Sequence, residues 1–330
     1  MPLIELHDVR KTFVVRRRAG RLRRTKEEVH AVENLSFTID AGEMVGYIGP
    51  NGAGKSTTIK MLTGILVPSS GTLRVADTEP ARDRVRLARR IGVVFGQRTT
   101  LWWDLPLRDS FELLRRIYKI PDGRYRHNLD RYVDLLELGD LLDSPVRQLS
   151  LGQRMRGDIA AALLHDPAVL YLDEPTIGLD IVSKTRVREF LRDLNAEQGT
   201  TVLLTTHDLV DIEQLCSRVM VIDHGRLMYD GSLDGLHQFG DNERTLVVDL
   251  VEPMPPIEVE GARFVKLDGP RQWLGFPAHA SAAPLVAAIA DRYPVADLSI
   301  QEPAIEAVIA RLYAGGLKVP TDTQFEHDAH

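Results

Sequence analysis

The sequence predicts an α/β fold followed by a smaller α+β domain, and two patterns support this. Over residues 1–240, short apolar runs typical of buried strands alternate with segments of helical periodicity, an order that favours a sheet covered by helices. From residue 241 onward the chain changes to strand-like runs, a proline-rich break and two helical patterns. We therefore expect a main domain over 1–240, an accessory domain over 241–316, and a frayed tail over 317–330.

Length and composition set broad limits on the class of protein. The chain has 330 residues, of which 44% are hydrophobic and 27% charged, and its formal net charge is -6. Its single cysteine excludes a disulfide framework and a cysteine-based zinc site. No apolar run approaches the roughly 18 residues that span a bilayer, and the first residues lack a signal-peptide core. We expect neither a secreted protein nor a membrane channel, and the mild acidity gives no reason to expect general nucleic-acid binding.

A helical insertion is predicted inside the main domain. Residues 98–165 hold few strand signals and three helical patterns, RDSFELLRRIYKI, RYVDLLELGDLLD and QRMRGDIAAALLH. In the accessory domain, the runs ARFVKL, QWLGF and VADLSI predict strands, and APLVAAIADRY and PAIEAVIARLYAGG predict helices.

Residues 16–26 form a strongly basic segment. The run RRRAGRLRRTK holds seven basic residues and no acidic residue. One interpretation is a solvated loop between two N-terminal strands. The other is a contact with anionic lipid headgroups or a partner, to which each basic residue would contribute about 1 kcal/mol. Nucleic acid is less favoured, because no aromatic residues are interleaved for stacking on bases.

The most specific motif is a phosphate-binding loop. Residues 49–56 read GPNGAGKS, which is G-x-x-x-x-G-K-[ST], between an apolar strand and a helical pattern. Glycines let successive backbone N–H groups surround phosphate oxygens, and the helix N-terminus adds a positive dipole end. Lys55 is expected to reach the β and γ phosphates, and the Ser56 hydroxyl to ligate Mg²⁺. The predicted ATP-binding residues of this segment are Gly49, Pro50, Asn51, Gly52, Ala53, Gly54, Lys55, Ser56 and Thr57.

Polar residues follow two further apolar strands. Asp173 and Glu174 end the run AVLYLDEP, and an aspartate at such a strand end holds Mg²⁺ in phosphate-loop enzymes. Glu174 is expected to face the γ phosphate, where a carboxylate can accept a proton from an attacking water. His207 follows the run TVLLTT, and the carboxyl ends of parallel strands converge. His207 is therefore expected to contact the γ phosphate or the water.

With these segments, residues 1–240 resemble the ATP-binding subunit of ABC transporters. Gln97 resembles the family's Q-loop glutamine, which contacts Mg²⁺ and water, and His207 resembles its switch histidine. Asp180, in GLD, is similar to the D-loop aspartate. Phe13 resembles the aromatic residue that stacks on adenine, a position at which the family more often has tyrosine. The resemblance implies a P-loop NTPase core with an antiparallel β subdomain and a helical subdomain.

The run LSLGQ over 149–153 is similar to the family signature LSGGQ. In the family this segment contacts the γ phosphate of ATP bound to the opposite subunit, which implies such contacts for Ser150, Gly152 and Gln153. Leu151 replaces the middle glycine. Because the phosphate loop, Asp173 and the other polar residues are intact, we expect an active ATPase.

The resemblance implies a dimer driven by ATP. Two copies would enclose ATP at two equivalent sites, and hydrolysis would open them. Because this chain cannot itself cross a bilayer, separate permease subunits are implied, with the chain peripheral on the cytoplasmic face of the membrane. At least one of Trp102 and Trp103 is expected to contribute to the permease groove.

The C-terminal run DLSIQEPAIEAVIARLY and the run FGQRTTLWWDLP resemble ABC-2-type exporters of the drug or viologen branch. Export is therefore expected. The alternatives are the ATPase of an ABC uptake system, a soluble ABC protein that acts on nucleic acid or ribosomes, and a regulator that binds ATP without turnover. A single phosphate loop and the lack of sustained heptads disfavour the soluble protein, so no specific nucleic-acid partner is expected.

Overall fold

The computed structural model divides the chain into two compact units, Met1–Gly231 and Ser232–His330, each described separately. It describes residues 2–18, 24–96, 98–206, 208–238, 243–277, 280–301, 308–309 and 312–313.

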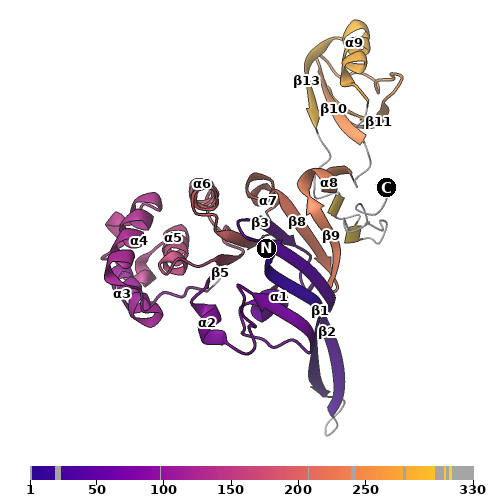
Figure 1. Ribbon diagram of the computed structural model, residues 1–330. Helices are drawn as coiled ribbons and strands as arrows, with labels where there is room; N and C mark the ends of the chain where they lie inside the picture. Colours follow the sequence, from indigo (N-terminus) through magenta and orange to yellow (C-terminus); the bar gives the residue numbers. More distant parts are fainter. Residues whose placement is uncertain are drawn as a thin grey trace, which may run out of the picture. The chain divides into compact units, whose positions relative to one another are not determined.

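The first unit is built around a six-stranded sheet of order β5-β6-β7-β3-β8-β9 (Figure 1). The strands are β3 (Met44–Ile48), β5 (Ile91–Phe95), β6 (Val169–Asp173), β7 (Thr201–Thr205), β8 (Arg218–Asp223) and β9 (Arg226–Ser232). Each neighbouring pair from β5 to β8 is parallel. All five residues of β3 are buried, as the continuous apolar runs predict. The α/β class is confirmed.

Helices cover this sheet, and a second sheet packs beside it. The helices outside the helical insertion are α1 (Lys55–Leu62), α2 (Arg84–Ala88), α6 (Ile181–Gln198) and α7 (Leu209–Leu215). The second sheet, of order β2-β1-β4, is antiparallel and comprises β1 (Pro2–Arg18), β2 (Arg24–Asp40) and β4 (Ser70–Val75). Its inner residues share one core with β3 and α1, and the rings of Phe37 and Tyr47 lie 6.1 Å apart.

The insertion consists of α3 (Leu107–Tyr118), α4 (Asp122–Leu135) and α5 (Leu151–Leu163), with α3 and α4 packed on α5 (Figure 1). The predicted second helix has the wrong bounds. It was expected over RYVDLLELGDLLD, but α4 begins at Asp122, and Gly139–Leu141 is a 3₁₀ turn. Glu137 has a φ of 49°, a left-handed conformation that a continuing α-helix does not contain.

The second unit contains a four-stranded sheet of order β11-β12-β10-β13. Its elements are α8 (Leu233–Gln238), β10 (Glu243–Leu250), β11 (Arg263–Asp268), β12 (Arg271–Pro277), α9 (Ala282–Arg292) and β13 (Val295–Gln301). Leu285 and Ile289 of α9 pack on sheet residues that include Leu246 and Phe276. The predicted strands and the first predicted helix are present. Most of the second predicted helix and all of the predicted tail lie outside the described residues.

Two tyrosines of the first core differ in their hydrogen bonding. Tyr47 and Tyr171 are both fully buried. The Tyr47 hydroxyl donates to Oγ1 of Thr58 at 3.2 Å, whereas no described residue is a hydrogen-bond partner for the Tyr171 hydroxyl. A buried hydroxyl without a partner costs free energy that a phenyl ring avoids.

We therefore expect Tyr171→Phe to leave the free energy of unfolding unchanged or to raise it by up to about 1 kcal/mol. Tyr47→Phe, the matched control, should lower it by about 1 kcal/mol, because it removes a made hydrogen bond. Urea denaturation of both variants measures the difference. A larger loss for Tyr171→Phe than for Tyr47→Phe would contradict this interpretation.

Candidate functional site

The phosphate loop connects β3 to α1. Gly54 is the N-cap of α1 with φ 107°, and Gly52 has φ 87°. A Cβ on Gly54 would lie 2.5 Å from the Ala31 carbonyl oxygen, so this turn requires glycine. A Cβ on Gly52 would meet no described atom within 4 Å, so the loop is open on that side. The loop thus leaves room beside the N-terminus of α1, where backbone N–H groups favour an anion.

Lys55 is held at the first position of α1. Its side chain is only 8% exposed, and Nζ donates to the carbonyl oxygens of Gly49 and Pro50, the latter at 3.2 Å. Burial lowers the pKa of the Lys55 ammonium group, and the nearby carboxylates of Glu174 and Asp173 oppose this shift. The lysine and the two carboxylates therefore influence one another electrostatically at this edge of the sheet. Ser56, the next residue, is exposed.

The two acidic residues follow β6 on the same sheet edge. Asp173 Oδ1 accepts a hydrogen bond of 2.6 Å from Oγ1 of Thr205, the last residue of β7. Glu174 has a φ of 57°, and its backbone N–H donates to the Thr205 carbonyl at 2.9 Å. A left-handed conformation is uncommon for a non-glycine residue, and such strain clusters at functional sites.

Gly96 is a site residue that the sequence analysis missed. Its N–H donates to the Asp173 carbonyl at 2.7 Å, and a Cβ there would overlap the Glu174 carbonyl oxygen. Gly96 therefore lets the segment before Gln97 approach the acidic pair closely. The FGQ sequence contains this signal, but only the paired strands reveal which backbone the glycine meets.

A buried polar network fixes the end of β7. Asp211 of α7 is fully buried, and it accepts hydrogen bonds from Thr176 Oγ1, from Thr206 Oγ1 at 3.1 Å, and from Arg188 Nε at 2.6 Å. Thr176 follows Glu174 by two residues, and Thr206 ends the apolar run before His207. The network thus connects the acidic segment, α6 and the end of β7. Asp211 and Arg188 were not predicted as site residues.

The predicted signature begins a helix. Ser150 is the N-cap of α5 in a reciprocal capping box: its Oγ accepts from the Gln153 N–H at 3.2 Å, and its N–H donates to Gln153 Oε1 at 2.8 Å. Ser150 is exposed. Leu151 is the first residue of α5, a helical position that does not require the family's glycine, and its Cδ2 would lie 2.9 Å from a Cβ on Gly178.

The predicted D-loop lies against the signature of the same chain. Asp180 caps α6 by accepting bonds from the N–H and the hydroxyl of Ser183, at 2.9 and 2.7 Å. These bonds hold the pKa of Asp180 below its usual value. A Cβ on Gly152 would lie 2.6 Å from the Ser183 Oγ. Gly152 therefore permits the signature and the start of α6 to pack closely.

The remaining predicted residues are placed less completely. Phe13 is half-buried in β1, and the Lys11 ammonium lies 5.2 Å from its ring centroid. Gln97 and His207 lie outside the described residues.

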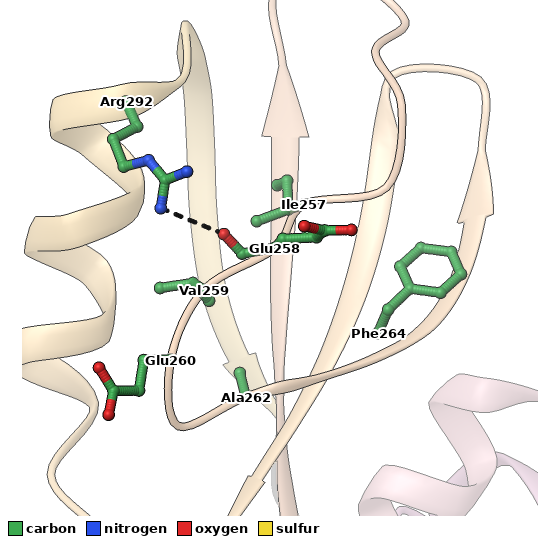
Figure 2. Close-up of a pocket in the computed structure, with 7 residues that line it drawn as sticks. All are labelled: Ile257, Glu258, Val259, Glu260, Ala262, Phe264 and Arg292. Carbon is green, nitrogen blue, oxygen red and sulfur yellow. Dashed lines mark hydrogen bonds between the residues drawn. The ribbon is translucent and has the colours of Figure 1, made fainter.

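In the second unit, a hollow of about 410 Å³ lies between α9 and the loop before β11, where Arg292 Nη1 donates to the Glu258 carbonyl at 3.3 Å (Figure 2). None of the predicted nucleotide-binding residues lines it.

The residues at this edge of the sheet fit a nucleoside triphosphate. The loop offers open space, N–H groups and a lysine, and the hydroxyl of Ser56 and the carboxylate of Asp173 are oxygen donors of the kind that Mg²⁺ prefers. Fold and site together define a phosphate-loop nucleotide-binding protein.

Comparison with known proteins identifies the family within that class. The family model of the ABC transporter matches residues 32–177. The ABC transporter ATP-binding protein NatA of Bacillus subtilis is 36% identical over 217 residues, which are 64% of this chain and 86% of that protein. The Nod factor export ATP-binding protein I of Sinorhizobium fredii is 39% identical over 241 residues, 70% of this chain and 69% of that protein. The chain belongs to the ATP-binding proteins of ABC transporters, and it is an ATPase.

Solved structures agree with this assignment. An ATP-binding subunit of an ABC transporter has a TM-score of 0.62 and 27% identity, over 72% of this chain and 92% of that one. The dimeric ATP-binding cassette MJ0796, in a post-hydrolysis state with ADP and Pi, has a TM-score of 0.60 and 28% identity, over 70% of this chain and 98% of that one. The predicted family resemblance is confirmed. Among the described residues, no helix is long and apolar enough to cross a membrane.

The close approach at Gly96 can be tested by a single methyl group. We expect Gly96→Ala to lower the free energy of unfolding by about 1–3 kcal/mol, because the new Cβ overlaps the Glu174 backbone. ATP turnover should also fall, since Glu174 must shift. Thermal unfolding and phosphate release measure the two effects.

Gly123→Ala is the control, because a Cβ there meets no described atom within 4 Å and Gly123 lies in α4. It should raise stability by about 0.5 kcal/mol. Equal stability and equal ATP turnover of Gly96→Ala and Gly123→Ala would contradict the assignment of Gly96 to the site.

Proposed function

We propose that this chain is the ATPase subunit of an ABC exporter, working as a homodimer beneath separate permease subunits. The observation that carries the proposal is the shared sheet edge: the phosphate loop after β3, the acidic pair after β6 and the polar segment after β7 end together. Residues 1–240 are proposed as the ATP-binding domain, with 98–165 its helical subdomain and 241–316 an accessory domain.

ATP binding is assigned to the loop and to one aromatic ring. The backbone of residues 49–57 would surround the phosphates, and Lys55 would leave its loop carbonyl partners to reach the β and γ phosphates. Phe13 would stack on the adenine. Ser56, Asp173 and Gln97 would hold Mg²⁺, which would supply positive charge against the phosphate oxygens.

Hydrolysis is assigned to Glu174 as general base, with His207 and Gln97 positioning the water and the γ phosphate. The left-handed backbone of Glu174 and the hydrogen bond from its N–H to the Thr205 carbonyl support this role, because they fix the backbone position from which the Glu174 side chain extends. Lys55 would stabilise negative charge that develops on the phosphate oxygens.

The dimer is assigned to contacts in trans. Ser150, Gly152 and Gln153 of one copy would meet the γ phosphate held by the other, and Asp180 would lie at the same interface. The exposed Ser150 at the N-terminus of α5 supports this, because the positive dipole end of a helix favours an anion. ATP would then connect the two copies, and loss of the γ phosphate would release them.

Coupling to transport is assigned to a permease at the membrane. The relatives include proteins named for Nod factor export and for daunorubicin resistance, which supports export rather than uptake. Trp102 and Trp103 are 38% and 50% exposed on the loop before α3, and they are proposed to enter the permease groove. The chain would then be peripheral on the cytoplasmic face of the membrane.

Replacing the general base tests the proposed mechanism. We expect Glu174→Gln to reduce turnover by about a hundredfold or more, because the amide cannot accept the proton. ATP binding should persist, and the closed dimer should accumulate because the ATP that connects the two copies is no longer hydrolysed. Phosphate release and size-exclusion chromatography with ATP measure both. The exposed Glu213→Gln variant is the control. Unchanged turnover in Glu174→Gln would remove Glu174 from this role.

The phosphate-loop lysine tests nucleotide binding separately. Lys55→Ala should weaken ATP binding by at least about tenfold, because it removes a charged donor to the phosphates. Lys60→Ala, on the exposed face of the same helix, should bind ATP normally. Equilibrium binding of a fluorescent ATP analogue measures both, and equal affinities for the two variants would contradict the assignment.

A further inference from the structure

The β1–β2 hairpin continues far beyond the sheet to which it belongs. β1 pairs with β2 from Pro2 to Arg18, but it pairs with β4 only from Ile4 to Arg10. The distal part is therefore a two-stranded ribbon, formed by residues 11–18 and 24–32 (Figure 1). Two strands alone are marginally stable in water, and among the described ribbon residues only Val32 belongs to the buried core of the unit.

The register of the ribbon gathers basic positions on one face. Arg16 lies opposite Lys26, and Arg18 lies opposite Arg24. Directly opposite positions share a face, and residues two apart along a strand return to the same face. All four positions therefore lie on a single face, here called the basic face. The only acidic position along this face within the ribbon is Glu28, opposite Val14.

Such a pairing is unfavourable for the hairpin by itself. Like charges directly opposite each other destabilise an antiparallel pair, and the basic face has two such pairs in succession. An anionic surface that lies against all four positions would reverse this repulsion. The stability of the hairpin therefore does not explain why basic residues occupy these four positions, whereas binding to an extended negative surface does.

One exposed apolar residue shares the basic face. Val14, two residues before Arg16, is 58% exposed, whereas Val15 and Val29, 41% and 40% exposed, lie on the opposite face of the ribbon. Exposed apolar side chains beside clustered arginine and lysine are typical of segments that lie at the surface of an anionic bilayer. Nucleic acid would call for interleaved aromatic residues, and the ribbon has no Trp or Tyr, while its one phenyl ring, Phe13, is half-buried beside Lys11.

We propose that the basic face, Arg16, Arg18, Arg24 and Lys26, docks on the anionic phospholipid surface of a membrane. The contact is electrostatic and does not involve the nucleotide site. It goes beyond the proposed function, which places the chain beside a membrane only through permease subunits. Direct lipid contact would add a second attachment and fix the orientation of the first unit at the bilayer.

The test is vesicle co-sedimentation of the full chain without nucleotide or permease. The vesicles contain either phosphatidylcholine alone or equal parts of phosphatidylcholine and phosphatidylglycerol. We expect binding to the anionic vesicles only, weakened by salt. The variant Arg16→Gln, Arg18→Gln, Arg24→Gln, Lys26→Gln should lose several hundredfold in partition coefficient, since each of the four basic residues contributes about fivefold.

A matched variant controls for net charge. Arg82→Gln, Arg84→Gln, Arg86→Gln and Arg89→Gln remove the same charge from exposed positions around α2, and binding should stay near that of the unaltered chain. Replacing the three arginines of the basic face by lysine should also preserve binding, because a lipid surface requires charge rather than bidentate geometry. Thermal unfolding should show that the glutamine variant is no less stable, since it removes two like-charge pairs.

Three results would overturn the proposal. These are equal binding of the unaltered chain to both vesicle types, an equal loss of binding in the two glutamine variants, and duplex DNA that competes fully with anionic vesicles through the same four residues. A failure of the proposed ATPase mechanism would leave this assay unaffected, so the two can fail separately.

Discussion

The parallel order β6-β7-β3 is the constraint on which the site depends. The strands end at one edge of the sheet, so segments more than a hundred residues apart in the sequence meet there without a dedicated scaffold. The hydrogen bond from Thr205 to Asp173 and the electrostatic influence of Asp173 and Glu174 on Lys55 are direct results of that convergence. A different strand order would leave the same motifs intact and unable to act together.

A second layer of contacts holds this edge in place. Arg188 forms an ion pair with the buried Asp211, which also accepts hydrogen bonds from threonines that flank the acidic segment and the predicted switch histidine. Buried charges are tolerated when they are paired and hydrogen-bonded, as here. The close packing of Gly152 against Ser183 extends this layer to α5, the helix that the predicted signature begins. Movement at one of these segments therefore meets resistance from the others, which suits a site that must open and close as a unit.

Much of this could be predicted from the sequence, because the phosphate loop and the strand-end acids are local patterns whose chemistry depends on a few residues in order. The fold class followed from apolar periodicity. What escaped prediction depends on contacts between distant segments: Gly96 matters because of the Glu174 backbone, and Asp211 because of three other elements. The end of α4 was not predicted because the left-handed residue Glu137 interrupts a sequence pattern that otherwise continues as a helix. The alignment of basic positions on one face of the hairpin required the strand register, which composition does not contain.

The central claim is that two copies of this chain enclose ATP, with the signature of one facing the phosphate loop of the other. A structure of the chain with a non-hydrolysable ATP analogue and Mg²⁺ tests it most directly. The account predicts a two-fold dimer in which Ser150 of each copy lies within hydrogen-bond distance of the γ phosphate bound at Lys55 of its partner. A nucleotide bound at Lys55 with Ser150 of every copy remote from any triphosphate would contradict it.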